Sequence, residues 1–152
     1  MAILTPAFRS DSERIHSEHE VLLDKLTEME RALDHLAVRS YASVDGANIE
    51  VVRGVGLKLT EEWPGHCRRE EEELLKTVAE VSPELNDFCR RMREEHQVLM
   101  AQLALFRVDL EGLKDACDPG AAVEHLIDDG TKLARALRQH VELEERELSG
   151  FL

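Results

Sequence analysis

A chain of 152 residues is long enough for one domain with a buried core and needs no disulfides to stabilise it. Its formal net charge of −13 repels nucleic-acid phosphates and anionic lipid, so neither nucleic acid nor a membrane is an expected partner. Aromatic residues make up only 4%, charged residues make up 34%, and Ala, Leu, Glu and Arg dominate. Because these four are good helix formers, the composition favours an all-α protein.

The cysteines and the N-terminal residues indicate a cytoplasmic protein. Cys67, Cys89 and Cys117 form no Cys-x-x-Cys pair, and an odd number is typical of free thiols in a reducing compartment. The first residues, MAILTPAFRSDSE, lack the basic start and long apolar core of a signal peptide. No run approaches the roughly 18 apolar residues of a membrane span.

Apolar residues at three- and four-residue steps predict a first helix over 10–38, with Ser10 and Glu13 as a capping box at its start. Residues 39–48, rich in Ser, Asp and Gly, are typical of a loop. A second helix is expected over 47–80, with a kink at Pro64 because an interior proline removes one hydrogen bond.

Two further helices are predicted over 83–114 and 119–149. Ser82-Pro83 and Asp118-Pro119 each supply an N-cap followed by a proline at the first helical position. Four helices with short connections predict a single domain over 1–152, an up-down-up-down four-helix bundle.

The chain also contains a weak internal duplication. Residues 17–26 (SEHEVLLDKL) match 94–103 (EEHQVLMAQL), which places His19 opposite His96. Residues 66–75 (HCRREEEELL) match 140–149 (HVELEERELS), which places His66 opposite His140 and Glu70 opposite Glu144. The two helix pairs are therefore expected to superpose about a pseudo-twofold axis.

A His-x-x-x-Glu motif puts both side chains on one helix face, where they can share a metal ion. Taken alone it is weak evidence, since a chain this rich in glutamate supplies such pairs by chance, as at His16 and Glu20. The evidence lies in the repeat and in the phase of the histidines. Each helix aims one histidine along its apolar face, and two helices also aim a glutamate there.

Such a set would be difficult to satisfy by mutual hydrogen bonds, and buried carboxylates are costly unless paired or metal-bound. Six ligands are too many for one tetrahedral zinc, and mixed nitrogen and oxygen ligands favour iron or manganese. The sequence therefore predicts two metal ions. The alternative is a helical bundle with core histidines and no metal.

The chain contains a lone histidine followed by a His-x-x-x-Glu motif, and this order occurs twice. The pattern resembles that of the hemerythrin-like (HHE cation-binding) domain family. The matching stretches are EHEVLLDKL, HCRREEEELL, EHQVLMAQL and HVELEERELSGF, and the likeness extends from about Ser10 to the C-terminus. The resemblance implies a four-helix bundle around two non-haem iron ions, bridged by two glutamates and usually an oxo or hydroxo group. By position, the implied metal ligands are His19, His66, Glu70, His96, His140 and Glu144.

One position departs from the oxygen-carrying members, which have a further histidine where this chain has Met92. The four-histidine set is more similar to the repair-of-iron-centres proteins and to the iron-sensing domain of an F-box protein. The resemblance thus implies a di-iron protein that binds or reacts with O2, NO or hydrogen peroxide, with an iron sensor or store as the alternative. Whether it is an enzyme stays open, as does the choice between monomer and homodimer.

Several other side chains are not assigned to the metal. His16 is expected at the rim of the site, His35 at the surface near a helix end, and His125 in a structural role. Glu71 and Glu145, which follow the two ligand glutamates, either accept hydrogen bonds from ligand imidazoles or face solvent. No catalytic nucleophile motif is present in the sequence.

Overall fold

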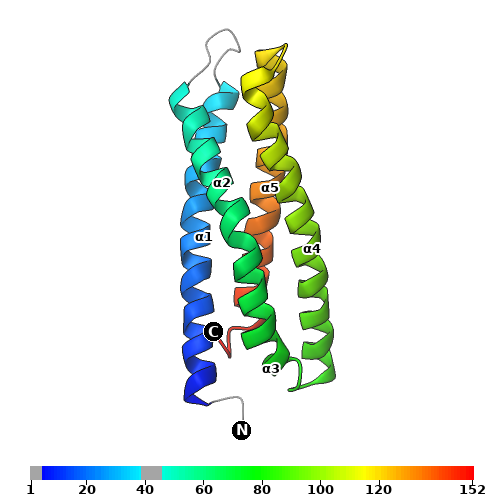
Figure 1. The fold of residues 1–152 in the computed structure, drawn as a ribbon. Helices are drawn as coiled ribbons and strands as arrows, with labels where there is room; N and C mark the ends of the chain where they lie inside the picture. The colour runs from blue at the N-terminus through cyan, green and yellow to red at the C-terminus, as the bar shows by residue number, and fades with distance from the viewer. Residues whose placement is uncertain (1–4, 39–45) are drawn as a thin grey trace.

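The computed structural model describes residues 5–38 and 46–152, which form a bundle of four long helices (Figure 1). These are α1 (Pro6–Val38), α2 (Gly46–Arg69), α4 (Pro83–Gly112) and α5 (Pro119–Glu147). A π-helical segment η2 (Glu70–Leu75) and the short α3 (Lys76–Val78) extend α2, and a 3-10 turn η3 (Leu113–Asp115) follows α4.

Each long helix runs opposite to the one before it, so the predicted up-down-up-down bundle is confirmed (Figure 1). Helix α1 packs against α2 and α5, and α4 packs against the same two helices. Helices α1 and α4 therefore lie on one diagonal of the bundle, and α2 and α5 on the other. The described residues contain no strand.

Side-chain caps fix the starts of three helices. The Ser82 Oγ accepts a hydrogen bond from the Leu85 N–H, and the Asp118 Oδ1 accepts one from the Ala121 N–H, each at 3.1 Å. Both caps confirm the sequence prediction. The start expected at Ser10 is wrong, because α1 begins at Pro6 and the Thr5 Oγ1 caps it by accepting from the Phe8 N–H at 3.1 Å. Thr5-Pro6 is the same cap-and-proline signal as at the other two helices.

The loop predicted over 39–48 is wrong at its last three residues and is untested elsewhere. Residues 39–45 lie outside the described residues, and residues 46–48 already belong to α2. Pro64 lies inside α2, as expected. The change in helical geometry comes later, at η2, which the sequence analysis did not predict.

A layer of polar residues divides the apolar core into two clusters. The larger cluster includes Leu22 and Leu99, and the smaller one, at the end of the bundle where α3 lies, includes Ile15 and Met92. On α1 and on α4 a buried histidine lies between the two clusters. Burying polar groups in the middle of a core is costly unless something satisfies them, so this layer is the part of the fold that needs explanation.

The rest of the described surface gives two further facts. None of the helices described here is both long enough and apolar enough to span a membrane. Cys67 and Cys89 are buried as free thiols, and Cys117 is exposed and free.

Candidate metal centre

Six side chains form the polar layer, and they are the six that the sequence analysis singled out. They come from all four sides of the bundle, namely α1, α2 with η2, α4 and α5. None of them exposes more than 3% of its surface. We call them the six-residue cluster: His19, His66, Glu70, His96, His140 and Glu144.

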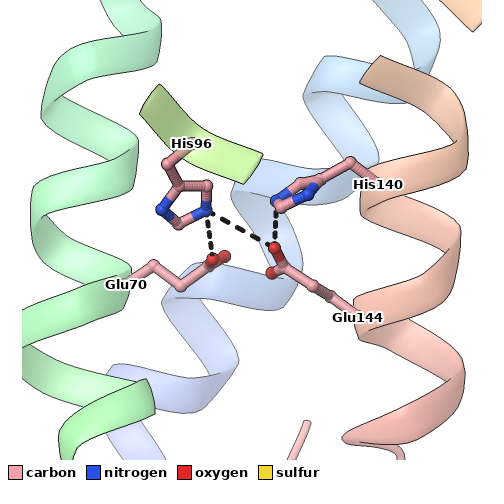
Figure 2. Close-up of side chains that lie close together, drawn as sticks. All are labelled: Glu70, His96, His140 and Glu144. Carbon is pink, nitrogen blue, oxygen red and sulfur yellow. Dashed lines mark ion pairs between the residues drawn. The ribbon is translucent and has the colours of Figure 1, made fainter. Parts of the chain in front are cut away.

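Every histidine of the cluster directs its Nε2 toward the glutamates. The Nε2 atoms of His19, His66 and His96 lie 2.9, 3.2 and 2.9 Å from the Glu70 carboxylate oxygens. The His140 Nε2 contacts the Glu144 Oε1, and the His96 Nε2 lies 3.5 Å from that oxygen (Figure 2). Glu70 points from η2 and Glu144 from α5 into the same space between the helices (Figure 2).

The potential ligand atoms of the cluster divide into two groups that share one residue. His19, His66 and Glu70 offer three atoms within 4.8 Å of one another, and Glu70, His96, His140 and Glu144 offer four. Glu70 belongs to both groups, because its Oε2 contacts His19 and His66 while its Oε1 contacts His96. This arrangement is what a pair of ions with a shared carboxylate requires.

Most of these inward atoms lack a hydrogen-bond partner. The Nε2 atoms of His66, His96 and His140 are buried without one, as are one oxygen of Glu70 and both oxygens of Glu144. They lie close to one another without forming hydrogen bonds. Unpaired buried polar atoms are rare in proteins, and a metal ion would satisfy all of them at once. The residues present therefore fit a bound metal pair.

An outer set of four glutamates holds the opposite ring nitrogen of each histidine. The Nδ1 atoms of His19, His66, His96 and His140 lie 2.7, 3.0, 2.9 and 2.6 Å from the carboxylates of these residues. In the same order they are the outer carboxylates Glu145, Glu18, Glu71 and Glu95. An ionised carboxylate only accepts, so each Nδ1 carries the proton and donates it, which leaves the Nε2 lone pair directed inward.

The outer carboxylates occupy equivalent positions in the two halves of the internal duplication. Glu18 and Glu95 each precede a cluster histidine, and Glu71 and Glu145 each follow a cluster glutamate. The sequence analysis suggested the second pair and missed the first. The signal was present as the repeated Glu-His dipeptide at 18–19 and 95–96. Its meaning depends on which neighbouring helix each side chain reaches.

The sequence profile of the hemerythrin HHE cation-binding domain matches residues 5–152. The chain belongs to the hemerythrin HHE family. Comparison with curated proteins gives no match, and neither does comparison with solved structures. Membership in a cation-binding family agrees with a layer whose residues fit a bound metal pair.

The π-helical segment η2 of this HHE domain contributes a residue to the six-residue cluster. It begins at Glu70, the residue that both ligand groups share. Single π-helical turns are rare and are frequently found at functional sites. The α5 counterpart, Glu144, lies in ordinary α-helix, so the two halves of the domain differ here.

Ionised histidines and glutamates stabilise one another in this buried layer. Burial disfavours the protonated form of His19, but its contacts with Glu145 and Glu70 outweigh burial and raise its pKa to about 10. Burial opposes ionisation of Glu70, yet the surrounding histidines hold its pKa well below the usual value. Protons and metal ions therefore compete for the same Nε2 atoms, and metal binding would release protons.

The histidines left out of the cluster behave in different ways. His16 lies at the rim, where its Nδ1 is 3.0 Å from Glu145 and its side chain is 45% exposed. His35 is exposed in the last turn of α1, as expected. His125, expected to be structural, is exposed and lies 3.1 Å from Asp129 and 3.5 Å from Asp109.

Asp109, Asp129 and His125 form a small charged group between α4 and α5 that the sequence analysis did not foresee. Burial and the neighbouring Asp129 raise the pKa of Asp109 to about 6. The two aspartates are 20 positions apart and on different helices, so only the packing of α4 against α5 brings them together.

Proposed function

We propose that this HHE domain binds two iron ions in the six-residue cluster and reacts with a small oxidant: O2, NO or hydrogen peroxide. The observation that carries the proposal is the division of the cluster into two groups of ligand atoms sharing Glu70. His19 and His66 would hold one ion, and His96 and His140 the other. Glu144 would be shared as Glu70 is, because its Oε2 and Oε1 lie 3.6 and 3.5 Å from the Nε2 atoms of His19 and His96. Iron in such a site can change between Fe(II) and Fe(III), and it would thereby supply electrons to a bound oxidant.

The protein's own contribution would be orientation and exclusion of water. The outer carboxylates fix the tautomer and the ring direction of each histidine, which prepares the Nε2 atoms for metal before it arrives. The two apolar clusters close the layer above and below. No member of the six-residue cluster is more than 3% exposed, so a reactant that reaches the cluster must be small.

Met92 bears on the type of chemistry. It lies one helical turn before His96, is 1% exposed and belongs to the smaller apolar cluster. Its thioether takes the position of the additional histidine of oxygen carriers. This supports a role linked to iron, NO or peroxide in preference to reversible carriage of O2.

Metal analysis and spectroscopy test this proposal. Protein purified from iron-supplied cells should contain about two iron ions per chain, and His66→Ala or His140→Ala should lower that number. The reduced protein should change its absorption spectrum on addition of O2, NO or hydrogen peroxide. Absence of iron, or iron without any spectral response to these three reactants, would refute it.

An iron sensor or store is the second candidate, supported by one feature of the fold. The cluster takes side chains from every long helix, so bound ions would join all four across an otherwise divided core. Metal that binds only the folded state raises its stability. A sensor should therefore melt at a clearly lower temperature without iron, and equal melting temperatures would remove this candidate.

We further propose a cytoplasmic location, because three free cysteines suit a reducing compartment. A small diatomic or peroxide ligand is the proposed partner. The net charge of −13 argues against nucleic acid.

A further inference from the structure

Two grooves on opposite sides of the bundle lead toward the six-residue cluster. The α4/α5 groove has a volume of about 600 Å³ and reaches His140, and the α1/α2 groove has about 350 Å³ and reaches His66. In each groove the carboxylate that holds the histidine, Glu95 or Glu18, lines the wall.

The internal duplication relates the two grooves position by position. Arg14, Glu18 and Val21 line the first, and Arg91, Glu95 and Val98, each 77 positions later, line the second. The two grooves are therefore equivalent sites of the internal duplication. Differences in their side-chain contacts arise at the positions where the two half-sequences differ.

Ion pairs join the two walls of the α1/α2 groove. The Arg69 Nε donates to the Glu18 Oε1 at 2.7 Å, which ties α2 to α1 directly beside His66. Lys25 of α1 donates to Glu62 of α2 further along. Arg14 of α1 pairs with Glu73 of η2 on the other side of this contact. Together these pairs brace the two helices along the length of the groove.

The α4/α5 groove has no such brace. The counterpart of Arg69 is Leu143, and the counterparts of Lys25 and Glu62 are Gln102 and Ala136. Among the groove residues, all of which the structure describes, the only ion pair joining α4 to α5 is that of Glu95 with His140. Glu95 is 47% exposed, against 23% for Glu18.

Charge also differs at the mouths. Glu94 stands beside Glu95 at the α4/α5 groove, where the equivalent position in the α1/α2 groove is Ser17. The lining of the α4/α5 groove carries two carboxylates and one cation, Arg91, whereas the lining of the α1/α2 groove carries two carboxylates and two cations. The more negative lining attracts cations more strongly.

We propose that divalent metal ions reach the six-residue cluster through the α4/α5 groove, by movement of Glu95 away from His140, while the braced α1/α2 groove stays closed. This inference rests on the proposed metal binding and adds the route and the residues that select it. Leu143 determines the open side, because it leaves Glu95 without a cation to hold it. Arg69 determines the closed side.

Val98 and Val21 provide a matched test. They are equivalent in the repeat, line the two grooves, and are 57% and 51% exposed, so a tryptophan fits at either without entering the core. Uptake of Fe(II) by the metal-free full-length chain is followed anaerobically by stopped flow against a ferrous chelator. Val98→Trp should slow uptake several-fold, and Val21→Trp should leave the rate unchanged, with equal final iron content in both.

Leu143→Arg tests the brace itself. The new guanidinium should hold Glu95 as Arg69 holds Glu18 and slow uptake, whereas Leu143→Gln, without the charge, should not. Melting temperatures of both variants check that they fold.

The outcomes separate the route from the metal site. If the unsubstituted chain takes up iron but Val21→Trp slows it as much as Val98→Trp, or neither variant slows it, the route is wrong and the metal site stands. If the unsubstituted chain takes up no iron, both proposals fail.

Discussion

Replacing Glu145 by glutamine should weaken the binding of one iron ion and spare the other. The Glu145 Oε1 accepts from the His19 Nδ1 at 2.7 Å, and its negative charge makes the His19 Nε2 a stronger donor to a metal. Glutamine keeps the size and one acceptor oxygen but removes the charge. Because His19 belongs to only one of the two ligand groups, only one ion should respond.

The size of the effect follows from the exposure of Glu145. Loss of such an outer partner typically costs about 10- to 100-fold in metal affinity. Glu145 is 25% exposed and also contacts His16, so solvent and a second partner moderate its influence on His19. We therefore expect the lower end, about tenfold, or about 1.4 kcal/mol.

Glu20→Gln is the matched control. Glu20 contacts the same His16, at 3.1 Å, but it is 67% exposed and touches no member of the cluster. Anaerobic titration of each metal-free variant with Fe(II), in competition with a chelator of known affinity, resolves two dissociation constants. If Glu145→Gln gives the same two constants as Glu20→Gln, or weakens both ions equally, the assignment of Glu145 to His19 and to one ion is refuted.

Three further predictions concern the fold. Leu26→Ala removes most of a fully buried side chain from the larger apolar cluster. It should lower the free energy of unfolding, measured in urea, by about 2–5 kcal/mol, and a decrease below about 1 kcal/mol would contradict the packing described. Asp109 has its pKa raised by burial and by Asp129, so ionisation of Asp109 costs stability as the pH rises through about 6. Asp129→Asn should therefore raise the melting temperature at pH 8 and give no gain at pH 4.5, where Asp109 is protonated; an equal gain at both values would exclude the repulsion. Thr5→Ala should cost about 1 kcal/mol through loss of the α1 cap, whereas Ser10→Ala should have little effect, and the reverse order would place the helix start at Ser10.

Short sequence signals were enough to predict most of the helices. A cap and a proline act within one helical turn, so Ser82 and Asp118 could be assigned from sequence alone. The same signal at Thr5-Pro6 marks the start of α1, which begins at Pro6, four residues before the start predicted at Ser10. The π-helical segment at Glu70 has no comparable sequence signal, because α and π turns use the same residues and differ only in which carbonyl each N–H reaches.

The sequence by itself determined which side chains face the interior. Helical periodicity placed one histidine on the apolar face of each helix, and the duplication showed that the two halves match. Every residue of the six-residue cluster is indeed buried. Its role as a metal site is a proposal that family membership supports and that the experiments above test.

Only the tertiary structure decided which residues act on one another across helices. Periodicity gives the direction of a side chain from its own helix axis, but not the rotation and height of the neighbouring helix. The pairing of Glu18 with His66, the nearness of Asp109 to Asp129, and the brace from Arg69 all depend on those two quantities. For this reason the sequence predicted a metal site, while the structure was needed to show which carboxylate of a neighbouring helix holds each histidine.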